Sequence, residues 1–254
     1  MSSDDSIPVQ LASVGTITPL CDAIHSQSSD VLNAVASDPV LPEDLALGLL
    51  QRLDLTPETL ERVGKNTSVM KSRKVKLALI RHPKTPRHVT VPLVRHLFTF
   101  DLMQVALMPT VPADVKVAAD EVLINRLETV SIGERLSLAH RGSSRIAGTL
   151  LRDAETRVMC AALDNPRLTE SLIVRAVNSH PARPAFIEAL CRHYKWSLRL
   201  EIRMVLLRND KTPLAKALEF VRALPAAQVR EIMNGSHLPS NIRAYIEKEL
   251  EKSR

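Results

Sequence analysis

The chain of 254 residues is long enough for one large domain or two of ordinary size, and it carries a formal net charge of +6. Its 7 glycines leave little material for β-hairpins or phosphate-binding loops, and no cluster among its few aromatic residues marks a cofactor or base-stacking pocket. The composition therefore argues against chemistry that needs such sites. Its 16 prolines run from Pro8 to Pro239 without a proline-rich stretch, as breaks between many short helices do, so we predict an all-α chain.

The predicted helices come in pairs around a corner. Five segments share the order helix, proline corner, helix, with apolar residues at helical spacing. In chain order they are 29–50, 72–94, 101–123, 153–177 and 199–221. The corner is Pro-x-x-Pro or a near variant, at Pro39/Pro42, Pro83/Pro86, Pro109/Pro112, Pro166/Thr169 and Pro181/Pro184. In the last of the five segments Asp210 replaces the first proline.

The corner has a simple physical basis. A proline cannot donate to the preceding turn and pushes the residue before it out of the helical region, so it ends one helix. A second proline fits the first turn of the next helix, where a missing N–H costs nothing. We therefore predict at least twelve helices, no sheet, and breaks at Pro39, Pro83, Pro109 and Pro166. Pro92 lies inside the predicted helix 86–97 and removes one hydrogen bond, so that helix could instead begin at Val91.

Each short helix needs neighbours to bury its apolar stripe, which favours an α-solenoid over the alternative of a globular bundle. The residues expected in the core are Leu77, Leu79, Val158, Ala161 and Leu172. We predict a single helical-repeat domain over 1–254, with a flexible segment at 1–10 and a C-terminal capping helix at 239–254 whose N-cap is Ser240. The helices 131–141 and 144–152 do not align with the repeats, and Gly142 takes the place of their corner.

One segment, DAETRVMCAALDNPRLTESLIVRAV at 153–177, resembles the bacterial leucine-rich repeat variant unit, a short relative of HEAT and armadillo repeats. The matching positions are Asp153, Arg157, Val158, Ala161, Asn165, Pro166, Leu168, Thr169, Leu172 and Val174. The Arg-Val order is reversed from the usual pair, and Thr169 stands where the second proline is expected. The resemblance implies a helical-repeat fold. Some relatives carry an iron–sulfur cluster on N-terminal cysteines, but this chain has only Cys21 there, so no cofactor is expected.

The charge of the chain changes sign along the sequence. Residues 1–61 hold ten acidic residues and one basic residue, Arg52, whereas 62–100 hold ten basic residues and no acidic one. The residues expected to form a partner-binding basic patch are Arg73, Lys74, Lys76, Arg81, Lys84, Arg87 and Arg95. Three interpretations stay open: the acidic N-terminal third neutralises the patch, through Asp38, Glu43 or Asp44, or the patch binds an acidic protein or peptide, or it binds nucleic acid.

Of the two external partners, nucleic acid is less favoured by the sequence than an acidic protein or peptide. Unpaired bases stack on aromatic rings, and the basic block offers only Phe98 and Phe100. A duplex needs no rings, and helical-repeat proteins that resemble alkylpurine DNA glycosylases hold duplex DNA on a basic face. The chain lacks the supporting aromatic chemistry of those enzymes, because Tyr194, Tyr245 and Trp196 all lie outside the block.

The sequence offers little support for a catalytic or metal-binding site. Cys21 and His25 share one face of a predicted helix at 19–26, but two ligands do not make a site. The histidines of the basic block are expected on the surface, and Trp196 is expected to pack between repeats rather than anchor a partner. The three cysteines form no CxxC pair, and neither a signal peptide nor a membrane span is expected, which favours a cytoplasmic protein. We therefore expect a non-catalytic interaction scaffold that binds an acidic protein or peptide, with nucleic-acid binding as the alternative.

Overall fold

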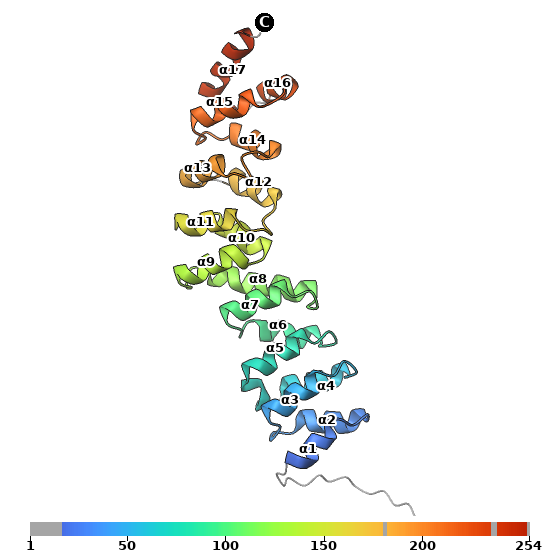
Figure 1. The fold of residues 1–254 in the computed structure, drawn as a ribbon. Helices are drawn as coiled ribbons and strands as arrows, with labels where there is room; N and C mark the ends of the chain where they lie inside the picture. The colour runs from blue at the N-terminus through green and yellow to red at the C-terminus, as the bar shows by residue number, and fades with distance from the viewer. Residues whose placement is uncertain (1–16, 180–181, 235–237, 253–254) are drawn as a thin grey trace, which may run out of the picture. The chain divides into compact units, whose positions relative to one another are not determined.

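A computed structural model describes residues 17–179, 182–234 and 238–252, and across them it holds α-helices, one 3₁₀ turn and no strand. The all-α prediction is confirmed, and the 17 α-helices of the described chain exceed the twelve expected. Figure 1 shows their order along the chain. The predicted flexible segment 1–10 lies outside the described residues.

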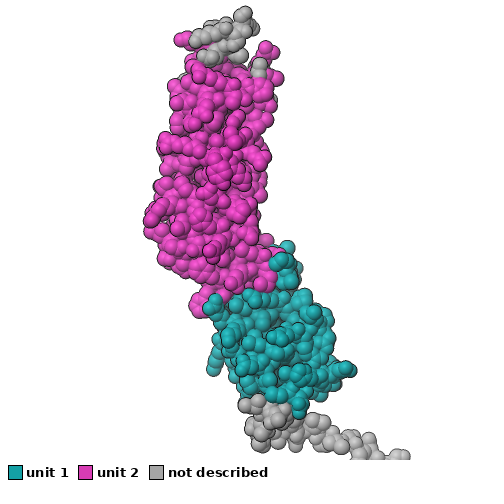
Figure 2. Space-filling model, viewed as in Figure 1, with its two compact units in different colours: residues 1–97, 109–115 teal, residues 98–108, 116–254 magenta. Residues whose placement is uncertain are grey.

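The chain divides into two compact units, residues 1–97 with 109–115 and residues 98–108 with 116–254 (Figure 2). The first unit contains α1 (Ile17–Ala23), α2 (Ser29–Ser37), α3 (Glu43–Leu50), α4 (Pro57–Lys65), the 3₁₀ turn η1 (Val69–Lys71), α5 (Arg73–Arg81) and α6 (Arg87–Val94). The first residues of α8 (Ala113–Arg126) also group with it. A single domain over 1–254 stays a prediction.

The second unit holds the remaining helices. They are α7 (Thr99–Leu107), most of α8, α9 (Ile132–Arg141), α10 (Ser144–Leu150), α11 (Thr156–Leu163), α12 (Glu170–Asn178), α13 (Pro184–Arg192), α14 (Leu200–Leu207), α15 (Leu214–Arg222), α16 (Ala226–Asn234) and α17 (Ser240–Lys252). The expected C-terminal helix is thus present, and it packs against α15 and α16. Ser240 is its first helical residue, so the prediction that Ser240 is the N-cap is wrong.

The predicted helix breaks are confirmed. Pro39, Pro83, Pro109 and Pro166 each lie between two helices. The expected alternative start at Val91 is wrong: α6 begins at Arg87, and Pro92 sits inside it. Proline has no backbone N–H, so α6 lacks one internal hydrogen bond at this position.

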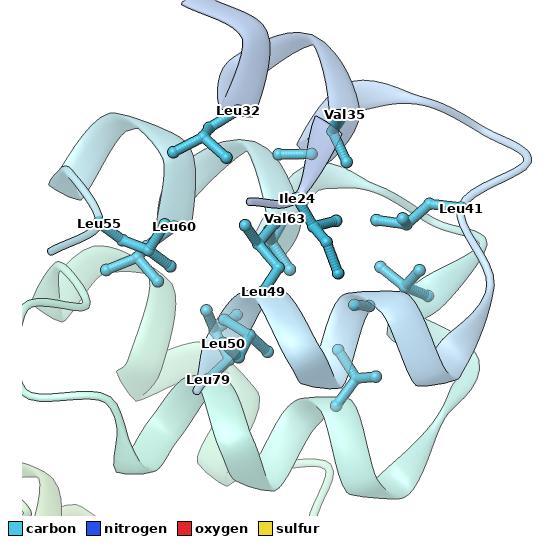
Figure 3. Packing of buried hydrophobic residues seen from close by; sticks show 14 residues of the cluster. Ile24, Leu32, Val35, Leu41, Leu49, Leu50, Leu55, Leu60, Val63 and Leu79 are labelled. Carbon is cyan, nitrogen blue, oxygen red and sulfur yellow. The ribbon is translucent and has the colours of Figure 1, made fainter. Parts of the chain in front are cut away.

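Helices in each unit pack against the second helix along the chain as well as their sequence neighbours. In the first unit α2 packs on α4 and α3 on α5. Their apolar stripes form one core, in which Leu49, Leu60 and Val63 are fully buried (Figure 3). In the second unit α9 packs on α11, α10 on α12, α11 on α13 and α12 on α14. Short helices of 7–10 residues are thereby stabilised by neighbours rather than by their own length.

Side chains at the corners bind backbone carbonyls of the corner two helices earlier. In the first unit the Nη1 of Arg52 donates to the carbonyl oxygens of Ile24 and Ser26, at 2.5 and 2.8 Å. The Nδ2 of Asn66 donates to the carbonyl of Asp38 at 2.8 Å. Because a carbonyl only accepts, His82 must donate from Nε2 to the oxygen of Arg52, at 2.8 Å.

The same bonds recur in the second unit. Asn165 Nδ2 donates to the carbonyl of Ala139 at 2.6 Å, Trp196 Nε1 to that of Leu163 at 2.8 Å, and Arg183 to that of Asp153 at 2.7 Å. Across both units these corner bonds join residues 23–33 positions apart. Within each compact unit, these bonds therefore tie one pair of helices to the pair before it.

Burial confirms most of the expected core. Leu79, Val158 and Ala161 are buried, whereas Leu77 and Leu172 are only partly buried. The buried stripe of α5 is instead Val75, Leu79 and Ile80, which leaves Leu77 at its edge.

Gly142 forms the α9–α10 corner, as expected. A Cβ at this position would lie 2.5 Å from the carbonyl oxygen of Leu138, so the corner is too tight for a side chain.

Candidate interaction surface

The basic patch centres on α5, whose start is fixed by its sequence. The Oγ of Ser72 accepts the backbone N–H of Val75 at 3.3 Å, which caps the helix. At about 100° per residue, Arg73, Lys74 and Arg81 fall within one arc opposite the buried stripe, and all three are exposed. The half-buried Leu77 lies between them. These four side chains, Arg73, Lys74, Leu77 and Arg81, are called the α5 face below.

Lys76 departs from the prediction that all the charges share the exposed side. On the same helical wheel it points between Leu79 and Ile80, and it is half-buried. It is therefore a border residue of the α5 face.

The other three expected residues lie on different elements. Lys84 is exposed in the α5–α6 corner. The hydrogen bond from Arg52 lowers the pKa of Asp54 to about 2, and the charge of Lys84 makes a small further contribution. Arg87 begins α6 and forms an ion pair with Asp114, with Nε 2.5 Å from Oδ2. Arg95 is the exposed C-cap of α6. The predicted patch therefore consists of one face of α5 and three basic residues that lie on other elements.

The position of the α5 cations along the helix matters as well as their exposure. Arg73, Lys74 and Lys76 occupy the first turn, which contains no acidic residue. The positive end of the helix dipole lies there, and cations at that end are disfavoured by about 0.3–1 kcal/mol each. Carboxylates from a partner would relieve this repulsion, so the start of α5 is suited to an acidic ligand.

Acidic residues of the N-terminal third neutralise the basic patch only in part. The Nζ of Lys74 lies 3.3 Å from Oε1 of Glu43, one of the three acidic residues expected to pair with the block. Asp38 instead accepts the N–H of Val40 within its own corner, at 2.8 Å. Both members of the Lys74–Glu43 pair are largely exposed, so water and salt screen their attraction and it contributes little stability.

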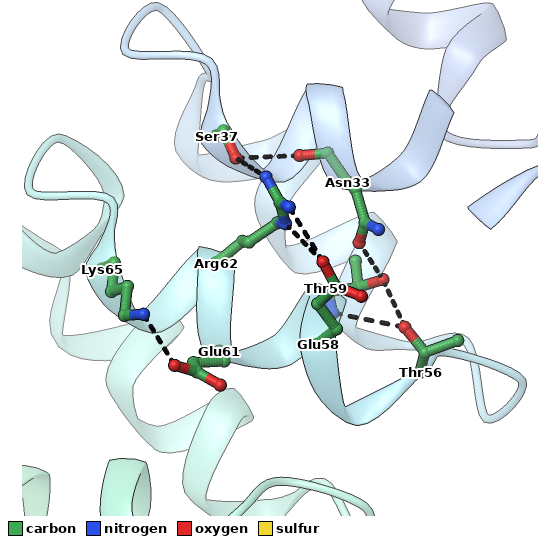
Figure 4. A network of polar contacts seen from close by, with 8 residues as sticks. All are labelled: Asn33, Ser37, Thr56, Glu58, Thr59, Glu61, Arg62 and Lys65. Carbon is green, nitrogen blue, oxygen red and sulfur yellow. Dashed lines mark hydrogen bonds and ion pairs between the residues drawn. The ribbon is translucent and has the colours of Figure 1, made fainter. Parts of the chain in front are cut away.

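A second set of ion pairs covers α4, on the opposite helix row (Figure 4). Arg62 pairs with Glu58 at 2.8 Å and Lys65 with Glu61 at 2.6 Å. His88 lies 3.5 Å from Glu61. The hydrogen bond and charge of Lys65 hold the pKa of Glu61 below its usual value, with a smaller contribution from His88. The first two cations of the basic block are therefore offset locally by carboxylates.

A shallow groove of about 720 Å³ lies beside the start of α5. One wall is the α2–α3 corner and the other is the segment from Ser68 to Ser72. Its lining residues are Pro39, Val40, Leu41, Pro42, Glu43, Ser68, Val69, Lys71 and Ser72. Sequence reasoning missed this groove, because its two walls are about thirty residues apart and no local pattern joins them.

Three further expectations concern metal binding, Trp196 and membrane-spanning helices. Among the described residues no group of three or more His, Cys, Asp or Glu side chains could hold a metal ion. Trp196 is buried, as its expected packing role requires, with 3% of its surface exposed. No helix of the described chain combines the length and apolar character that crossing a membrane requires.

Comparisons with protein-family models, with curated proteins and with solved structures gave no match.

Proposed function

We propose that this chain is a non-catalytic helical-repeat scaffold that binds an acidic protein or peptide through the α5 face. One observation carries the proposal: three exposed cations, Arg73, Lys74 and Arg81, lie on one side of a helix whose first turn has no acidic residue. The helix dipole adds positive potential at the same end. Charge of one sign on a fixed scaffold accelerates association with an oppositely charged partner.

The scaffold part of the proposal is supported by the corner bonds. Each links a corner to the one two helices before it, which is the pattern expected if the pairs stack as an α-solenoid. Stacked repeats present long rows of side chains and bind partners through them. We also place the protein in the cytoplasm, since its three cysteines are free thiols and a reducing compartment keeps thiols in that form.

An acidic polypeptide fits this surface better than nucleic acid does. Glu43 lies beside Lys74 of the α5 face, and its carboxylate would repel a continuous phosphate backbone. A peptide can place its acids at chosen positions and avoid it. The first unit also contains no phenylalanine, tyrosine or tryptophan on which an unpaired base could stack.

The test compares two triple variants of the full chain. The first changes Arg73, Lys74 and Arg81 to Glu. The control changes Arg141, Arg152 and Arg208 to Glu, which alters net charge equally at exposed sites of the second unit. The probes are a poly-glutamate peptide and a short DNA duplex, titrated at several salt concentrations.

We expect the peptide to bind the unchanged protein and the control variant, and to lose at least tenfold in affinity for the α5 variant. Equal peptide binding by both variants would overturn the proposal. Selective binding of the duplex, with a steep salt dependence that the α5 variant reduces, would establish the nucleic-acid alternative instead.

A further inference from the structure

The groove beside α5 has an exposed apolar side chain at its rim. Val40 is 63% exposed, and Pro39 and Pro42 flank it. The neighbouring Leu41 turns inward and is buried, and so is Val69 on the opposite wall. The groove therefore combines an apolar rim and floor with an open side, which is a surface that gains by covering an apolar side chain from water.

The shape of this corner is fixed by its own hydrogen bonds. The backbone N–H of Val40 donates to Oδ1 of Asp38 at 2.8 Å, and that of Leu41 donates to the carbonyl oxygen of Asp38 at 3.2 Å. Asn66, at the C-terminal end of α4, donates to the Asp38 carbonyl and so joins the α2–α3 corner to the corner after α4. A preformed groove spends little conformational entropy when a ligand enters it.

Charge indicates what kind of ligand this groove accepts. Lys71 and Ser72 line it, and Arg73 follows directly as the first residue of α5. The one acidic residue in the lining, Glu43, is already paired with Lys74. A ligand that enters the groove and continues along α5 thus passes Lys71, Arg73 and Lys74, and carboxylates complement all three.

We propose that the groove between the α2–α3 corner and the start of α5 holds an apolar side chain of the acidic partner, while the carboxylates of that partner contact the α5 face. This inference rests on the proposed function and specifies the ligand: an extended segment with one aliphatic residue followed by acidic ones.

Helix geometry limits the spacing. The nine residues of α5 span about 13 Å at ~1.5 Å per residue, and an extended peptide covers that length in about four residues at ~3.3 Å each. Acidic residues within about four positions of the aliphatic anchor therefore reach from Lys71 to Arg81. An isolated acid farther along the peptide lies beyond the helix.

The experiment uses two peptides and three forms of the full chain. One peptide has a leucine followed by four glutamates, and in the other a serine replaces the leucine. The proteins are the unchanged chain, Val40→Ser, and Leu53→Ser as a matched control. Leu53 is 70% exposed in the same unit and does not line the groove. Both positions are exposed, so neither change removes buried packing.

The unchanged protein should bind the leucine peptide about tenfold more tightly than the serine peptide, which corresponds to about 1.4 kcal/mol. Val40→Ser should abolish this preference and leave the serine peptide unaffected, while Leu53→Ser should keep the preference. The triple charge variant of α5 should weaken both peptides equally.

Other results separate the two proposals. If both peptides bind the unchanged protein equally and the α5 charge variant weakens them, the groove inference is wrong and the proposed function stands. If neither peptide binds, the proposed function and the inference fail together. If sedimentation shows a homodimer that Val40→Ser dissociates, the groove holds a second copy of the chain, and the inference is overturned.

Discussion

The side-chain amide of Asn165 joins two corners of the second unit: its Nδ2 donates to the carbonyl oxygen of Ala139, 26 residues earlier, at 2.6 Å. Its Oδ1 accepts the backbone N–H of Arg167 at 2.8 Å. Only 1% of the residue is exposed, so water cannot replace either bond. One side chain thus closes its own corner and holds it to the preceding repeat.

This arrangement predicts that Asn165→Asp is nearly as damaging as Asn165→Ala. Aspartate can still accept from Arg167 but cannot donate to Ala139, and its charge would be buried beside a carbonyl. We expect either change to lower the free energy of unfolding by about 2–4 kcal/mol, measured by urea denaturation. Asn178→Ala, at an exposed residue, serves as the control and should change it by less than about 0.5 kcal/mol. An Asn165→Asp protein of unchanged stability would contradict the two-bond role.

The sequence predicts several of these corners, but it does not predict the hydrogen bonds that join them. A proline removes one backbone donor and disfavours helix in the residue before it, so Pro39, Pro83, Pro109 and Pro166 located four breaks correctly, although Pro92 lies inside α6. Their spacings of 44, 26 and 57 residues are uneven because not every corner contains a proline. The corners at Asn66 and Gly142 have none. The more regular feature is the bond to a carbonyl two corners earlier, which arginine, asparagine, histidine and tryptophan can all provide.

The candidate surface was predicted to a similar extent. The helical periodicity of α5 correctly predicted that Arg73, Lys74 and Arg81 are exposed to solvent, because this periodicity depends on local sequence alone. The partners of the block could not be found in this way. Glu43 lies 31 residues before Lys74, and Asp114 lies 27 residues after Arg87. These pairs depend on how the helices pack. The charge reversal made Glu43 one of three candidate partners but did not single it out, and Asp114 was not among the candidates.

A second prediction follows from the interchange of residue types at the corners. His82 accepts the N–H of Lys84 at Nδ1 and donates from Nε2 to Arg52, as Asn66 accepts from Ser68 and donates to Asp38. We expect His82→Asn to cost less than about 1 kcal/mol of stability and His82→Leu about 1–3 kcal/mol, since leucine leaves both partners unpaired in a buried corner. Urea unfolding of the two variants side by side measures the difference. Equal losses would show that His82 acts only through its volume.

Two neighbouring aromatic residues should differ sharply in their contribution to stability. Trp196 is buried and donates to Leu163, whereas Tyr194 is 74% exposed and stacks on His193. We expect Trp196→Ala to lower the free energy of unfolding by about 3–5 kcal/mol, and Tyr194→Ala by less than about 1 kcal/mol. Thermal unfolding of both variants provides the comparison. A Tyr194 variant as unstable as the Trp196 variant would mean that the stacked pair, rather than the buried indole, holds the α13–α14 corner.

The last prediction concerns Asp120, a buried carboxyl on α8 that accepts the hydroxyl of Ser143 at 2.8 Å. Burial raises its pKa above the ordinary value of 3.8, and the bond from Ser143 and the charge of Arg145 only partly offset that effect. Because the folded state holds this proton more tightly than the unfolded state does, the contribution to stability is complete below pH 3.8 and is lost as the pH rises through the raised pKa.

Asp120→Asn removes the charge but keeps an oxygen that accepts from Ser143. We therefore expect the stability of the variant, relative to the unchanged protein, to increase with pH from about 3.8 upward and then to level off. Urea unfolding at a series of pH values from 3 to 7 measures this difference, in which the other titrating groups cancel. Glu128→Gln, at an exposed carboxyl, is the control for removing one carboxylate elsewhere on the surface of the unit. A relative stability of Asp120→Asn that falls as the pH rises would show that the charged carboxylate is favoured in the folded protein, contrary to its burial.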